Sequence, residues 1–119
     1  MTRLPHALAV LAAAATVLYA SASAGAAPAK LTGTVGPGFT ITLKMGGKAV
    51  KSLKAGKYTI TVLDRSNIHN FHLKGKGVNK DSGIVAVGTK RWTVTLKRGS
   101  YVFVCDPHAT SMKGKFTVK

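Results

Sequence analysis

The segment Tyr58-Thr59-Ile60-Thr61-Val62 alternates apolar and polar side chains, and Trp92-Thr93-Val94-Thr95-Leu96 repeats the pattern further along the chain. Because successive side chains of a strand point to opposite faces of a sheet, each segment predicts a strand with one buried face. Phe39 to Leu43 shows the same alternation. These segments place the chain in the all-β class.

Short apolar runs separated by turn residues continue through most of the chain. Further strands are predicted at Leu31 to Val35, Ile68 to Leu73, Tyr101 to Cys105 and Lys115 to Val118, with short ones at Ala49 to Leu53 and Ile84 to Val87. Seven or eight strands with turn signals between them are typical of a two-sheet antiparallel Greek-key β-sandwich. We expect the core to contain Phe39, Ile41, Leu43, Tyr58, Ile60, Val62, Trp92, Val94 and Leu96.

The first 26 residues have the composition of an export signal. Met1 to Arg3 is basic, Leu8 to Tyr19 is apolar, and Ser21 to Ala27 offers several Ala-x-Ala cleavage patterns. This order is typical of a secretory signal peptide that is removed on export. We therefore expect residues 1–26 to be cleaved and residues 27–119 to form one domain.

The charge is strongly one-sided. Lysine and arginine total 18 against three acidic residues, which gives a formal net charge of +15. A field of this sign attracts anionic partners, although scattered lysines also keep the edges of β-sheets from pairing with each other. The lysines form no stripe, and the chain is expected to be exported, so we do not expect nucleic acid as a partner.

The segment Tyr101 to Met112 contains the residues most suited to bind a metal ion. It ends a predicted strand with Cys105 and then adds His108 and Met112 within seven further positions. Asp106-Pro107 prevents a helix from starting at once, so the loop is expected to turn back over its own start. The single cysteine has no partner for a disulfide within the chain, and an exported thiol needs either burial or a function.

These residue types favour copper. A thiolate, two imidazoles and a distant thioether are the ligands of a blue-copper electron-transfer site. Zinc also binds thiolate and imidazole, but it rarely binds a thioether. The second imidazole comes from His69 or His72, which fall on opposite faces of a strand, so only one of them can reach the site. A buried inert cysteine and a methionine that merely fills the core are the alternatives.

The same residues resemble the cupredoxin family, in particular plastocyanin, pseudoazurin and amicyanin. The resemblance lies in the loop from Cys105 through Pro107 and His108 to Met112, and in the pair His69-Asn70. It implies one mononuclear type 1 copper held by His69, Cys105 and His108, with Met112 as the axial ligand. It also implies that Asn70 supports these ligands through hydrogen bonds. Asp106 and Pro107 lie on the same loop and are expected to support the site too, and Asp106 either lowers the copper potential by its charge or bonds a backbone donor of the loop. Three residues separate His108 from Met112, whereas plastocyanin-like loops usually have four and amicyanin-like loops two.

The predicted function is a one-electron carrier that cycles between Cu(I) and Cu(II) in the periplasm or outside the cell. We expect a monomer that meets acidic or anionic redox partners transiently, and an anionic cell-surface polymer or membrane surface could also attract its lysines. An enzyme is not expected, because a filled mononuclear site leaves no position for a substrate. A copper-storage or copper-delivery protein with the same ligands is the alternative.

Overall fold

The structure is a computed structural model that describes residues 12–16 and 27–119, and residues 12–16 have no regular secondary structure. The predicted signal peptide, residues 1–26, therefore lies mostly outside the described residues and stays a prediction. Within the described part, no helix has the length and apolar character needed to cross a membrane.

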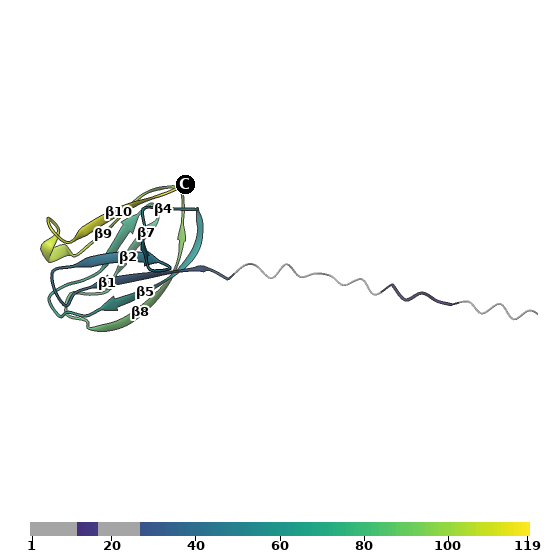
Figure 1. Cartoon of the computed structure of the whole chain (residues 1–119), viewed down its shortest axis with the longest axis horizontal. Coiled ribbons are helices and arrows are strands. Elements are labelled where there is room, and N and C mark those ends of the chain that lie inside the picture. Colours follow the sequence, from purple (N-terminus) through teal and green to yellow (C-terminus); the bar gives the residue numbers. More distant parts are fainter. Residues whose placement is uncertain (1–11, 17–26) are drawn as a thin grey trace, which may run out of the picture.

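Ten strands in the described residues form two five-stranded sheets that make a β-sandwich (Figure 1). The first sheet has the order β3–β2–β1–β5–β8: Lys48–Ala49, Ile41–Met45, Ala29–Val35, Gly56–Asp64 and Gly88–Leu96. The second has the order β4–β10–β9–β6–β7: Ser52–Leu53, Lys113–Val118, Gly99–Val104, His72–Gly75 and Val78–Asp81. The predicted sandwich class is confirmed.

Two details of the predicted sandwich are wrong. The sheets are mixed, because β1 pairs with β5 and β10 pairs with β4 in parallel. The strand count is ten in the described residues, above the predicted seven or eight. Part of the difference comes from the predicted strand Ala49 to Leu53, in which the chain leaves the first sheet after β3 and joins the second at β4.

Two other predicted strands also differ from the structure. Residues 84–87 form a bend with exposed side chains between β7 and β8. Strand β6 starts at His72, so residues 65–71 form a loop. The Phe71 N–H at the end of this loop donates a hydrogen bond to the Ser82 side chain. Apolar content predicted strands in both places, but residues 84–87 pair with no strand of the described part, and the predicted strand Ile68 to Leu73 pairs only from His72 onward.

The core lies between the sheets, and most of the predicted core residues belong to it. The phenyl ring of Phe71 stacks on that of Phe103 with centroids 5.7 Å apart, and Tyr101 stacks on Phe116 at 5.2 Å. Phe39 is the clear exception, with 64% of its surface exposed. It precedes β2 and lies outside the sandwich, so its predicted place in the core is wrong.

One end of the sandwich gathers four loops, which we call the loop pole: residues 36–40, 65–71, 82–87 and 105–112. They connect β1 to β2, β5 to β6, β7 to β8 and β9 to β10. The strand register places them together, since Val35 pairs with Asp64, Asp64 with Gly88, and His72 with both Asp81 and Val104. Figure 1 shows the β9–β10 loop at the end of the domain opposite the C-terminus.

Candidate metal centre

The loop between β9 and β10 is closed by its own backbone. The Cys105 N–H donates to the carbonyl of Met112 at 2.9 Å, and the Met112 N–H donates to the carbonyl of His108 at 2.8 Å. A 3-10 helix spans Asp106–His108, with Pro107 in its first turn, where a missing N–H costs no helical hydrogen bond. The loop therefore brings Cys105, His108 and Met112 to the same end of β9.

His69 comes from the loop between β5 and β6, which is fixed on both sides of it. Ser82 Oγ donates to Asp64 Oδ2 at 2.9 Å and accepts a hydrogen bond from the Phe71 N–H at 2.8 Å. On the other side, the Ser66 N–H donates to Asp64 Oδ1 at 3.2 Å. These bonds tie the loop to the end of β5 and to the start of the β7–β8 loop.

Three ligand atoms meet where these two loops face each other. The Nδ1 atoms of His69 and His108 lie 3.1 Å apart, and each lies 3.6 Å from Cys105 Sγ. A metal ion bonded at about 2.0 Å to imidazole nitrogen and about 2.3 Å to thiolate fits a triangle of this size. Nδ1 of His69 faces the sulfur and the second ring, and its Nε2 is buried without a hydrogen-bond partner among the described residues. The geometry fits a metal bound by both Nδ1 atoms and Sγ.

The site is shielded from solvent on most sides. His69 and Cys105 are fully buried, Met112 is 1% exposed, and His108 is partly exposed. Met112 belongs to the core cluster beneath the loop, where its backbone is bonded to both Cys105 and His108. Of the two upstream histidines, the structure brings His69 to Cys105.

Asn70 connects the two loops. Its side-chain oxygen accepts a hydrogen bond from the Asp106 N–H at 2.7 Å, and its Nδ2 donates to Asp106 Oδ2 at 2.7 Å. The same Nδ2 donates to Asp81 Oδ1 at 2.9 Å. The residue after His69 is thus bonded to the residue after Cys105, which holds the two candidate ligands in a fixed relation.

His72 lies on the outer side of this network. Its Nδ1 is 2.8 Å from Asp106 Oδ2, and its Nε2 is 2.5 Å from Asn79 Oδ1. Burial raises the pKa of the Asp106 carboxyl, but hydrogen bonds from Asn70 and His72 and the charges of His72 and Lys74 outweigh it, so the pKa lies below its usual value.

His72, Asp81 and Asp106 also bring ligand atoms within 4.8 Å of one another. However, Asn70 Nδ2 donates to both carboxylates, and His72 Nδ1 faces Asp106. The ligand atoms of His72, Asp81 and Asp106 that face one another therefore already have hydrogen-bond partners. We interpret this group as a support for the Cys105 loop and not as a second metal site.

Phe39 covers the candidate centre from the β1–β2 loop. Its ring meets the His69 ring edge-to-face with centroids 5.0 Å apart and the His108 ring at 4.9 Å. Gly36 lets the β1–β2 loop lie against the β5–β6 loop, because it has a φ of 70° and a Cβ there would lie 2.8 Å from Ser66 Cβ. The role of Phe39 was missed because its alternation with Ile41 and Leu43 predicted a core strand residue.

Asp64, Ser66, Ser82 and Asp81 are supporting residues that the sequence analysis did not identify. Aspartate and serine in a polar bend signal local hydrogen bonds to the backbone. That signal was present around Asp64 and Ser66, but nothing in the sequence pairs Asp64 with Ser82.

Comparison with known proteins agrees with this geometry. A family model described as copper binding proteins of the plastocyanin/azurin family matches residues 48–119. The chain belongs to this family. As a plastocyanin/azurin-type protein, or cupredoxin, it uses copper as its cofactor, and the arrangement of His69, Cys105, His108 and Met112 is typical of a type 1 copper site. It is therefore a copper-binding electron-transfer protein.

Solved structures support the cupredoxin fold. Reduced rusticyanin is 25% identical over 76% of this chain and 78% of its own, with a TM-score of 0.57. Rusticyanin from Thiobacillus ferrooxidans is 24% identical over 76% of each chain, also with a TM-score of 0.57. A solution structure of reduced rusticyanin gives 23% identity and a TM-score of 0.53. No curated protein sequence matches the chain.

Proposed function

We propose that the protein is an exported one-electron carrier whose copper ion cycles between Cu(I) and Cu(II). His69, Cys105 and His108 are the proposed equatorial ligands and Met112 the axial ligand. The observation that carries the proposal is the convergence of two Nδ1 atoms and one Sγ within 3.1 to 3.6 Å of one another.

The ligand set and its support suit this task. Bound copper would supply the one-electron couple, and a set of sulfur ligands and imidazole nitrogens can hold both Cu(I) and Cu(II). The two ligand-bearing loops are closed by backbone bonds and joined through Asn70. Ligands held in this way move little when the charge of the site changes, which keeps electron transfer fast.

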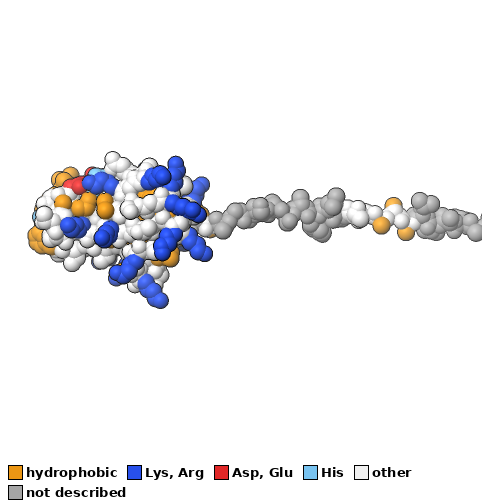
Figure 2. All heavy atoms as spheres, turned by 90° about the horizontal axis from the view of Figure 1, so that it is seen from above, with side chains coloured by type: hydrophobic (Ala, Val, Ile, Leu, Met, Phe, Trp, Pro, Cys, Tyr) orange, Lys and Arg blue, Asp and Glu red, His pale blue; other side chains and the backbone are white. Residues whose placement is uncertain are grey.

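His108 is the proposed point of electron exit, because it is the partly exposed member of the set. Exposed apolar side chains share its end of the molecule: Phe39 at 64%, Ile68 at 51% and Val85 at 83%. Figure 2 shows hydrophobic and histidine side chains at the left-hand end of the domain. A redox partner can approach His108 there over a surface that is easily desolvated.

Other parts of the proposal rest on the burial of the ligands and on the composition of the chain. The buried ligands leave no open position for a substrate, which supports a carrier over an enzyme. Export rests on the composition of residues 1–26, and a location in the periplasm or outside the cell follows from it. The net charge supports acidic redox partners that bind transiently and release at higher salt.

Cyclic voltammetry of the copper-loaded protein tests the carrier against copper storage or delivery. We expect a reversible one-electron couple whose peak separation changes little with scan rate. The reduced protein should also keep its copper in the presence of a Cu(I) chelator. Slow, irreversible electrochemistry together with rapid loss of Cu(I) to the chelator would support copper handling and contradict the carrier.

A further inference from the structure

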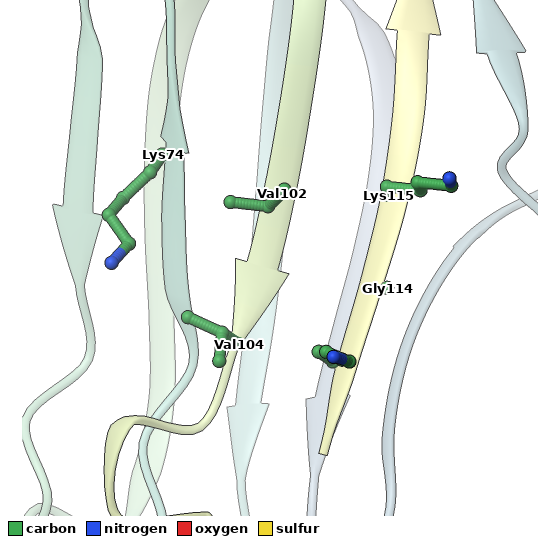
Figure 3. A pocket seen from close by; sticks show the side chains of 6 residues that line it. Lys74, Val102, Val104, Gly114 and Lys115 are labelled. Carbon is green, nitrogen blue, oxygen red and sulfur yellow. The ribbon is translucent and has the colours of Figure 1, made fainter. Parts of the chain in front are cut away.

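The outer face of the second sheet combines lysines with an apolar floor. Lys74 on β6, Val102 on β9 and Lys115 on β10 lie opposite one another in the register, so Val102 has a lysine on each side. One step closer to the loop pole, Val104 lies between His72 and Lys113. Figure 3 shows Lys74, Val102 and Lys115 on three neighbouring strands, with Val104 further along β9.

These residues line a groove of about 570 Å³, made by Lys74, Val102, Val104, Lys113, Gly114 and Lys115. Val102 is 42% exposed, Val104 is buried, and the groove lining contains no carboxylate. A second groove shares Val102 and Lys115 and adds Lys51 at the other side of β10. The floor therefore continues across the sheet between lysines.

The outer face of the first sheet has cations too, but no such floor. On this outer face Lys30 on β1 is followed by Thr32 and Thr34, and Lys57 on β5 is followed by Thr59, Thr61 and the half-buried Leu63. Lysines that only keep the protein soluble need no apolar residue between them. The valines thus distinguish the second sheet as the face that fits a partner.

The loop pole cannot supply the attraction for an acidic partner. Among its four loops the lone cation from lysine or arginine is Arg65, and all three acidic residues, Asp64, Asp81 and Asp106, lie in or next to these loops. The nearest dense positive surface along the chain is the groove, since Val104 directly precedes Cys105 and Lys113 directly follows Met112.

We propose that this groove, which we call the Val102 groove, is the docking surface for an acidic segment of a partner protein. The segment lies along β9 with an apolar side chain on Val102 and carboxylates near Lys74, Lys113 and Lys115. A polymer of sugars or a lipid headgroup would match the lysines but leave the valine floor unused. The proposal extends the proposed carrier function, because the partner is taken to be its redox partner.

The test is an NMR titration of the Cu(I)-loaded, nitrogen-15-labelled protein with a short peptide in which glutamate alternates with leucine. We expect amide shifts centred on Val102 and Val104. The double variant Lys74→Glu with Lys115→Glu should weaken binding by about tenfold or more, since it reverses both flanking charges. The matched variant Lys44→Glu with Lys57→Glu, on the first sheet, changes net charge equally and should weaken binding by less than about threefold.

Further measurements distinguish an acidic protein segment from a polyanion or a membrane surface. A peptide of glutamate and serine should bind more weakly than the glutamate–leucine peptide, as should the variant Val102→Thr with the original peptide. Equal losses in both double variants, or shifts spread over all lysines, would overturn the proposal. Tighter binding of a heparin fragment or of phosphatidylglycerol vesicles at the same groove would also overturn it, in favour of a polyanion or membrane surface.

The outcome can be separated from the proposed function. None of the substituted residues is a proposed ligand, so every variant should keep its copper absorption and its voltammetric couple. A protein that keeps both but does not bind the peptide at this groove contradicts the docking surface alone. A protein that binds the peptide there but shows no reversible couple contradicts the carrier and leaves the docking surface standing.

Discussion

Asn70 is the residue through which the two ligand-bearing loops hold each other. It makes three hydrogen bonds, two with Asp106 and one with Asp81, and it is fully buried. Asn70→Ala should lower the free energy of unfolding by about 1–3 kcal/mol, because it removes the hydrogen bonds of a buried side chain to the Asp106 N–H and to the carboxylates of Asp106 and Asp81. It should also weaken copper binding by about 10- to 100-fold.

Thermal unfolding and competitive copper titration measure these two effects. Asn67→Ala is the matched control, since Asn67 is exposed and makes no side-chain hydrogen bond in the described residues. Its effect should stay within about 0.5 kcal/mol. If both variants bind copper equally well, Asn70 does not hold the site in position.

Met112 can be tested by a swap that keeps its volume. Met112→Leu should cost less than about 1.5 kcal/mol in stability. The reduction potential should rise, because a thioether donates to the more positive Cu(II) and its loss favours Cu(I). Protein-film voltammetry measures the potential, and Met45→Leu, at the exposed end of β2 away from the loop pole, is the control. An unchanged potential in Met112→Leu would make this residue core filler only.

At the scale of single residues, the spacing of Cys105, His108 and Met112 predicted that they share one loop. The strand-face argument could not decide between His69 and His72. Cys105, His108 and Met112 lie within eight positions, so one tight loop had to bring them together. The choice of His69 over His72 came from the resemblance carried by Asn70. Its structural cause is that the strand starts only at His72, which leaves His69 free to turn inward. Loop conformation of this kind is set by contacts distant in sequence.

At the scale of elements, glycines let aromatic rings lie flat across the second sheet. A Cβ at Gly114 would lie 2.2 Å from Phe103 Cζ, and one at Gly75 would lie 2.0 Å from Tyr101 Cδ1. Gly114→Ala should therefore destabilise the fold by about 1–3 kcal/mol, because the ring and the strand must move apart. Urea unfolding measures the loss.

Gly38→Ala is the control for this effect, since a Cβ there meets nothing within 4 Å. Its free energy of unfolding should change by less than about 1 kcal/mol. Equal stability of the Gly114 and Gly38 variants would mean that Phe103 has room to shift and that the close packing is not needed.

Strands with clean alternation were predictable, and those without it were not. In segments such as Tyr58 to Val62 every second side chain is apolar, and these are the side chains that the strand buries. Such alternation identifies both the strand and its buried face. Strand β7, Val78–Asp81, has one buried residue and is held by pairing with β6, so its own sequence shows little pattern. The exposed residues 84–87 are apolar for a reason other than the core.

At the scale of the whole molecule, metal binding and folding should be coupled. The proposed ligands come from loops 36 positions apart in the chain, as His69 and Cys105 show, and meet only when the two sheets have formed. Copper in excess should raise the midpoint of thermal unfolding, by a stabilisation of about 2.7 kcal/mol at a hundred times the dissociation constant. Calorimetry with and without copper measures the shift, and Cys105→Ser should remove most of it. An equal shift in both proteins would place the ion elsewhere.

Positive charge is distributed unevenly over the ends and faces of the folded domain. The sequence predicted a strongly positive chain but could not place the lysines in space. Folding leaves the loop pole almost without cations and collects lysines beside Val102 on the second sheet. This separation depends on the pairing of β6, β9 and β10, which local patterns do not reveal.

The visible absorption spectrum of the Cu(II)-loaded protein tests the central claim most directly. A thiolate bound to Cu(II) in a type 1 site predicts an intense band at about 600 nm that disappears on reduction and in Cys105→Ser. A folded, copper-loaded protein with a reduced Cys105 and no such band would contradict the assignment of Cys105, His69 and His108 as copper ligands, and with it the proposed carrier.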